Sequence, residues 1–184
     1  MPKKTRNLLM LVLFLLPLKS IAVEYEMMRS EKIKISIPAG WDFKEAAKRD
    51  IPNVKYNTNY TVTNDGVKIE ITGVRLGKGV LDTEDKLNNA LVEGGEQYLL
   101  KAKENRISPI SISNKDLIGS YAELNCASEN KCFRVFRDSS WNSVITATLR
   151  VNNVFFYISA GLDSDHPDKR VALLDILRSI GPKQ

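Results

Sequence analysis

The chain has 184 residues, of which 43% are hydrophobic and 27% charged, and its formal net charge is +5. These fractions are those of an ordinary globular protein, and low-complexity runs and internal repeats are absent. Four basic residues and no acids precede residue 23, which leaves 23 basic and 22 acidic residues in the rest of the chain. The basic excess therefore belongs to the N-terminal segment, and nothing in the composition indicates a nucleic-acid surface.

Residues 1–22 have the pattern of a secretory signal peptide. Met1–Arg6 is basic, and the apolar run Leu8–Leu16 is shorter than the ~20 residues that span a bilayer. Ser20 and Ala22 are small residues at the positions that a signal peptidase reads. No cysteine follows the apolar run, so a lipid anchor is not indicated. We expect cleavage after about Ala22 and a periplasmic or secreted product without a transmembrane segment; an uncleaved anchor is the alternative.

The first half of the remaining chain predicts strands. After a poorly ordered lead-in at residues 23–31, a strand is expected at Lys32–Ile37, because its three isoleucines alternate with polar residues. Asn64-Asp-Gly66 is a strong hairpin signal. It predicts pairing of two further strands, Val54–Val62 and Val67–Thr72, with a bulge at Gly73. One or two helical turns are expected over Phe43–Arg49.

A long amphipathic helix is expected over Thr83–Asn105, with Asp82 or Thr83 as its N-cap. Gly94-Gly95 lies on or beside its buried stripe and costs about 1 kcal/mol per glycine relative to alanine. The pair indicates either a bend in the helix or a neighbour that packs closely against it.

The second half predicts more antiparallel strands and a closing helix. An edge strand is expected at Ile107–Ser113, because it contains Pro109. Two hairpins follow. After them, a helix is expected over Pro167–Ser179, with Val171, Leu174 and Leu177 on its buried stripe. The hairpins are Leu117–Cys126 with Cys132–Asp138, and Val144–Val151 with Val154–Ala160 around the turn Asn152-Asn153. The fold class is therefore α+β, an antiparallel sheet flanked by helices, in one domain over residues 32–184.

Cys126 and Cys132 are the two cysteines of the chain. An even count in an exported protein favours a disulfide bond between them. The spacing excludes a redox Cys-x-x-Cys motif, and a zinc site would need more ligands than the chain offers. We expect a structural disulfide.

The chain contains one histidine, His166, in the loop Asp163-Ser-Asp-His-Pro-Asp168. This loop could bind a divalent cation, but it lacks the glycine and the distal glutamate of a calcium loop. Helix capping by Asp165, with Asp168 reaching back, is the favoured interpretation. No nucleophile motif or phosphate loop is present, so we expect no catalytic residue, no metal and no cofactor.

Four aromatic residues are candidates for a ligand pocket or a partner surface: Trp41, Tyr56, Tyr60 and Trp141. Aromatic side chains of this kind also occur commonly in the core and at its rim. Their residue type alone leaves both interpretations open.

Two segments resemble the PsbP-like superfamily: Ile33–Ile37 followed by Pro38-Ala-Gly-Trp41, and Val154-Phe-Phe-Tyr-Ile-Ser followed by a polar loop and Val171–Ile180. That superfamily includes the extrinsic photosystem II protein and bacterial exported proteins such as the DcrB-like group. The resemblance covers Lys32–Ile180. It implies an antiparallel sheet between helices and non-enzymatic binding or assembly roles, with no active site to carry over.

We therefore expect an exported, non-enzymatic binding or accessory protein that acts through a protein partner, of the immunity or envelope-assembly type. Two alternatives stay open. One is a small hydrolase or metal-dependent enzyme that uses the Asp163–Asp168 loop, and the other is a carrier of a small apolar ligand. An apolar pocket away from the packed core favours the carrier, whereas an exposed aromatic patch favours the protein partner.

Overall fold

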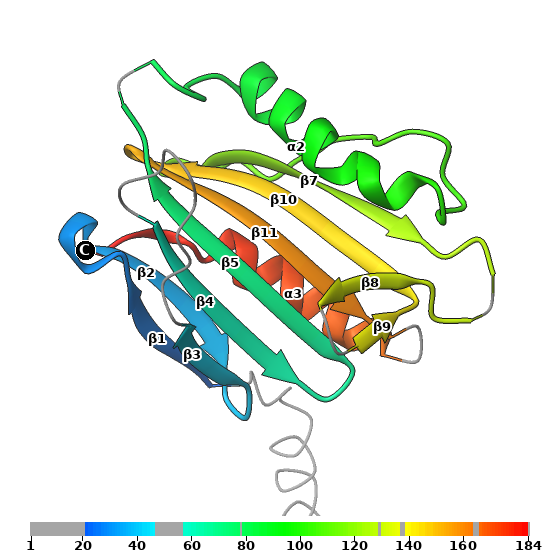
Figure 1. Cartoon of the computed structure of the whole chain (residues 1–184). Coiled ribbons are helices and arrows are strands. Elements are labelled where there is room, and N and C mark those ends of the chain that lie inside the picture. Colours follow the sequence, from blue (N-terminus) through cyan, green and yellow to red (C-terminus); the bar gives the residue numbers. More distant parts are fainter. Residues whose placement is uncertain are drawn as a thin grey trace, which may run out of the picture.

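The computed structural model describes residues 21–46, 57–77, 79–128, 130–136, 139–163 and 166–183. Its centre is a seven-stranded antiparallel sheet with the strand order β3-β4-β5-β11-β10-β7-β6 (Figure 1). The strands are β3 (Asp42–Ala46), β4 (Asn57–Asn64), β5 (Val67–Arg75), β6 (Ile110–Ser111), β7 (Ile118–Asn125), β10 (Ser143–Val151) and β11 (Val154–Leu162).

The hairpin of β10 and β11 forms the middle of the sheet, as the sequence predicts. Its register pairs Val151 with Val154 across the turn, and Asn152 has the positive φ, 56°, that this turn requires. Alternate residues face opposite sides, because successive side chains of a strand point to opposite faces. Layers on both sides then cover them, and Ile145 and Thr146 are both buried.

One face of the sheet is covered by helix α3 (Pro167–Arg178) and by a small sheet of three strands, β1 (Ala22–Met27), β2 (Ile33–Pro38) and β12 (Gly181–Pro182). Figure 1 shows α3 behind the large sheet. The isoleucines of β2 and the leucines of α3 join the inward residues of β5, β10 and β11 in one core. The opposite face belongs to helix α2 (Glu84–Leu99), which packs on β7 and β10.

Close packing of α2 explains the glycine pair, and the helix runs through it without interruption. A Cβ atom at Gly94 would lie 2.7 Å from the ring of Tyr157, and one at Gly95 would lie 2.6 Å from Ile107. The Tyr157 hydroxyl donates to the carbonyl of Gly94 at 3.1 Å, and Thr148 donates to that of Leu87 at 2.9 Å. These contacts bring the helix backbone close to the sheet.

Strands β8 (Phe133–Phe136) and β9 (Ser139–Trp141) form a separate two-stranded sheet. The expected hairpin between Leu117–Cys126 and Cys132–Asp138 is therefore wrong, because β8 pairs with β9 and not with β7. The disulfide itself is confirmed: the sulfurs of Cys126 and Cys132 are bonded, and their Cα atoms are 5.8 Å apart. It joins the end of β7 to the segment that enters β8.

Loss of this disulfide should lower the free energy of unfolding by about 2 kcal/mol. The bond stabilises the fold by restricting the unfolded chain, and the effect is modest because the loop that it closes is short. Denaturant unfolding of Cys126→Ser measures the loss, and reduction of the unmutated protein should give a similar one. Free thiols in the denatured, unreduced protein would contradict the pairing.

Several local expectations are wrong. The lead-in at residues 23–31 is not poorly ordered, since it holds β1 and the short helix η1 (Arg29–Glu31). Phe43–Arg49 begins as strand β3 instead of helix, and residues 47–49 lie outside the described part. Pairing continues through Gly73 without a bulge, and a Cβ atom at this glycine would lie 3.0 Å from Met28 and from Phe156. Helix α2 ends before Asn105, and the strand expected at Ile107–Ser113 shortens to β6.

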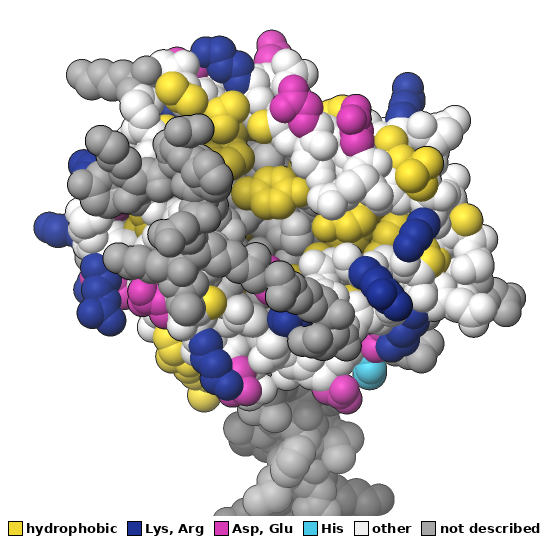
Figure 2. Space-filling view, viewed as in Figure 1, with side chains coloured by type: hydrophobic (Ala, Val, Ile, Leu, Met, Phe, Trp, Pro, Cys, Tyr) yellow, Lys and Arg dark blue, Asp and Glu magenta, His cyan; other side chains and the backbone are white. Residues whose placement is uncertain are grey.

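The fold class is confirmed as α+β, with an antiparallel sheet between helices. Figure 2, drawn from the side seen in Figure 1, shows charged side chains of both signs spread around the rim of that face. Among the helices in the described ranges, none has the length and apolar character needed to cross a membrane.

Candidate functional site

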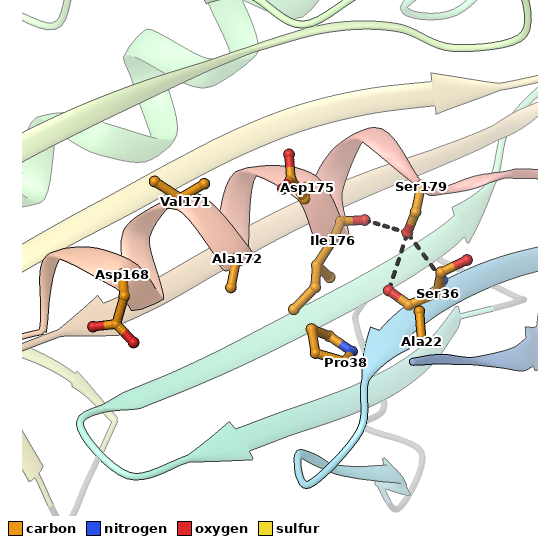
Figure 3. Close-up of a pocket in the computed structure, with 9 residues that line it drawn as sticks. All are labelled: Ala22, Ser36, Pro38, Asp168, Val171, Ala172, Asp175, Ile176 and Ser179. Atoms are coloured by element: carbon orange, nitrogen blue, oxygen red, sulfur yellow. Dashed lines mark hydrogen bonds between the residues drawn. The ribbon is translucent and has the colours of Figure 1, made fainter. Parts of the chain in front are cut away.

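A groove lies between α3 and the outer side of the small sheet (Figure 3). Its volume is about 360 Å³. In Figure 3, Ala172 and Ile176 point from the helix toward Pro38 of β2. The residues that line the groove are Ala22, Ser36, Pro38, Asp168, Val171, Ala172, Asp175, Ile176 and Ser179. Most of this lining is apolar, so the groove offers a surface for apolar side chains.

Hydrogen bonds fix the wall that β2 contributes. The backbone N–H of Ser36 donates to the Ser179 hydroxyl at 2.9 Å, and that hydroxyl donates to the carbonyl of Ile176 at 2.6 Å. Pro38 has no N–H, and its carbonyl accepts from Trp41 at 3.2 Å. This side of β2 therefore has no free backbone donor at Ser36 or Pro38 for an added strand, and the groove is suited to bind side chains.

The outer face of α3 gives the groove an apolar centre between two acids. Asp168 and Asp175 are seven residues apart, about 10 Å along a helix. Val171 lies between them with 57% of its surface exposed. Asp175 forms a 3.2 Å ion pair with Arg178 on the helix surface. The prediction that Val171 belongs to the buried stripe is wrong, because Leu173, Leu174, Ile176 and Leu177 fill the buried side.

The three predicted aromatic candidates in the described part of the chain are buried. Trp41 and Tyr60 are buried in the core that the large sheet shares with α3 and the small sheet. The Tyr60 hydroxyl accepts the backbone N–H of Met28 at 2.6 Å, and burial raises the pKa of this phenol. Trp141 is buried on the other face of the sheet, with its ring against Gly161. Tyr56 lies outside the described residues.

Sequence reasoning missed a pair of half-buried aromatics, Tyr25 on β1 and Phe43 on β3. Their rings stack with centroids 4.6 Å apart, and Phe43 in turn stacks on Tyr60 at 5.6 Å. The alternation of residues 22–27 contains the signal for Tyr25, because it continues the strand pattern into the supposed lead-in.

The loop around His166 is held by structural contacts. His166 is the N-cap residue of α3 but makes no side-chain cap hydrogen bond, and its ring lies against Gly66 of the β4–β5 turn. Asp163 forms a 2.7 Å ion pair with Lys131. Asp165, the residue predicted to cap the helix, is not in the described part of the chain. Within the described ranges, no three His, Cys, Asp or Glu side chains are grouped to hold a metal ion.

A second hollow of about 330 Å³ has a polar lining of mixed sign. Its acid Asp82 forms a 2.7 Å ion pair with Lys86, and this hydrogen bond holds the pKa of Asp82 below its usual value. The lining residues are Asp82, Lys115, Asp116, Ile118, Arg150 and Asn152. Two acids and two bases line it, so it has no excess of either sign to attract a charged ligand.

No family model matches the sequence, and no curated protein matches it. The solved structures that are similar to this chain include the following two. The yeast (Saccharomyces cerevisiae) Ran-binding protein Mog1p is 12% identical, with a TM-score of 0.46 over 90% of this chain and 97% of that one. The solution structure of cyanobacterial PsbP (CyanoP) from Synechocystis sp. PCC 6803 is 10% identical, with a TM-score of 0.56 over 89% of this chain and 93% of that one. At these identities the likeness concerns the fold alone: the chain has a PsbP-like fold.

Proposed function

We propose that this protein is an exported binding or accessory module whose ligand is another protein, and that the groove beside α3 is part of the contact surface. The observation that carries the proposal is the apolar centre of the groove at Val171, which is 57% exposed between two acids. An exposed apolar side chain by itself is ordinary. Here it lines a formed groove, where the side chains of a partner can be buried.

Export is the second part of the proposal. The signal-peptide pattern of residues 1–22 and the Cys126–Cys132 disulfide support it. Cleavage after Ala22 removes one residue of β1, Ala22, which is also one of the residues that line the groove. Val23 to Met27 would still pair with β2, so the small sheet would persist.

Cleavage predicts a protein that begins near Val23. Intact-mass measurement on the protein from the exported fraction checks this. A product of full-length mass that stays in the membrane fraction would contradict export with cleavage.

A carrier of a small apolar ligand is the second candidate, because the groove is apolar and lies outside the packed core. Ligand pockets usually bury 70–90% of their ligand, in volumes of about 300–1,000 Å³. This groove is at the low end of that range and open at Val171. Its form suits part of a protein surface better than an enclosed small molecule.

Site-specific photo-crosslinking tests the protein-binding function. A photoreactive residue at Val171 should give one discrete cross-linked protein in the producing cells, and Val171→Asp should prevent rescue of a deletion phenotype. The control position is Lys115, which is exposed and lies outside the groove. Equal products from both positions, or none from Val171, would refute binding at the groove. Saturable binding of an apolar dye that Val171→Asp abolishes, without a protein cross-link, would favour the carrier.

A further inference from the structure

The small sheet has an outer edge, formed by β1, that no strand in the described ranges covers. The pairing of β1 with β2 decides which backbone groups face this edge. Ala39 donates to the carbonyl of Ile21, and the register then places Val23, Tyr25 and Met27 in hydrogen-bonded pairs with β2. The N–H and C=O groups of the alternate residues, Glu24 and Glu26, therefore point outward.

Two independent contacts support this alternation. On β2, the N–H of Ser36, the partner of Glu24 in a non-hydrogen-bonded pair, points away from β1 and reaches Ser179. Just past the end of β1, the N–H of Met28 donates to Tyr60. The open edge thus spans Glu24 and Glu26, with two donors and two acceptors. Unpaired backbone groups of this kind are a template for an added strand.

The side chains around the edge specify what kind of strand fits. On the inner side, Tyr25 stacks on Phe43 and both are half-buried, while Val23 is 43% exposed. An apolar side chain of an added strand would cover these groups. The residues of the added strand whose side chains face Tyr25 and Val23 are therefore expected to be apolar.

On the outer side the edge carries two carboxylates. Lys34 contacts Oε1 of Glu24 at 2.6 Å, and Lys183 contacts Oε1 of Glu26 at 3.4 Å. Each carboxylate has a second oxygen that can accept a further hydrogen bond. A lysine or arginine on an added strand would extend the alternation of charge across the sheet, whereas a second copy of β1 would bring glutamates opposite glutamates.

We propose that the outer edge of β1 accepts an extended segment of a partner protein in which Lys or Arg residues alternate with apolar residues. The proposal rests on the protein-binding function above and names the chemistry of the partner. The main-chain hydrogen bonds give affinity, and the alternate side chains give specificity, as in other cases of strand addition.

The probe is a short synthetic peptide in which lysine alternates with valine, titrated into the ¹⁵N-labelled protein as the cell produces it. The amide signals of Glu24 and Glu26 should shift, and their hydrogen exchange should slow. Glu24→Gln should weaken binding about threefold, as expected for loss of one exposed ion pair. Glu24→Pro also removes an outward N–H, which an edge strand tolerates, and should weaken binding more than tenfold.

The controls separate the possible results. A peptide with glutamate in place of lysine should not bind, and N-methylation of the lysine peptide at the residue opposite Glu24 should abolish binding even if Glu24→Pro fails to fold. Equal binding of the two peptides, or no shift at millimolar peptide, overturns the inference. Shifts confined to Val171 and Ala172 overturn it but leave protein binding at the groove intact. A dimer that Glu24→Pro dissociates would assign the edge to a second copy instead.

Discussion

Replacing Ile35 by aspartate is expected to lower the free energy of unfolding by about 4 kcal/mol or more, which is most of the stability of an ordinary domain. Ile35 has no exposed surface and lies in the middle of β2, between Ile33 and Ile37. Its side chain belongs to the core that the small sheet shares with the large sheet and α3. A carboxylate there would lose its hydration without gaining a partner, and its methyl contacts would also be lost.

Lys34→Asp is the matched control, since it places the same side chain one residue earlier on the outer face of the same strand. It removes the 2.6 Å ion pair with Glu24 and brings two acids together. Pairs this exposed contribute about 0.2–1 kcal/mol, so the loss should be about 1 kcal/mol. Urea unfolding of both variants measures the difference. Similar losses would mean that both faces of β2 are buried or that the strand is not formed.

Local patterns in the sequence predicted several elements whose structure depends on residues close along the chain. The alternation of Ile33, Ile35 and Ile37 identified the buried face of β2. Asn152-Asn153 set the register of the central hairpin, because a two-residue turn fixes which residues pair. In both cases the pattern and the turn chemistry lie within a few residues of the structure that they determine.

Three strand pairings were not predicted, and only one of them joins segments that are distant in the sequence. Gly181-Pro182, which follows the predicted closing helix, pairs as β12 with β2 some 150 residues earlier. Residues 22–27 alternate as a strand does, but their position beside the predicted signal peptide suggested a lead-in. The spacing of the two cysteines suggested a hairpin between the strands that carry them, but β8 pairs with β9 instead. A disulfide requires only that its two Cα atoms lie close together, and not that they belong to one hairpin.

The candidate site was the least predictable part. Residue type alone indicates Trp41, Tyr60 and Trp141 as candidates, but all three are buried, because an aromatic ring suits a core as well as a surface. Val171 fits the apolar period of α3, yet four other apolar residues already fill the side that faces the sheet. A groove also needs a second wall, and here β2 supplies it from the other end of the chain.

Gly119→Ala should be destabilising by about 3 kcal/mol, although alanine usually suits a strand better than glycine. Gly119 is buried in β7, opposite Leu149 of the central strand β10. An added Cβ would lie 2.9 Å from the Cα of Leu149 and would overlap the carbonyl oxygen of Thr148. Both are main-chain atoms of a strand that is paired on its two sides, so they cannot move away without loss of hydrogen bonds.

Gly77→Ala is the control, and its effect on the free energy of unfolding should have the opposite sign. No atom lies within 4 Å of a Cβ at Gly77, and its φ is not in the left-handed region. The substitution should therefore raise the free energy of unfolding by about 0.5 kcal/mol, because alanine restricts the unfolded chain more than glycine does. Thermal unfolding of the two variants compares the effects directly. A melting temperature for Gly119→Ala at or above that of the unmutated protein would mean that β7 and β10 are not in the close contact that places Gly119 against Leu149.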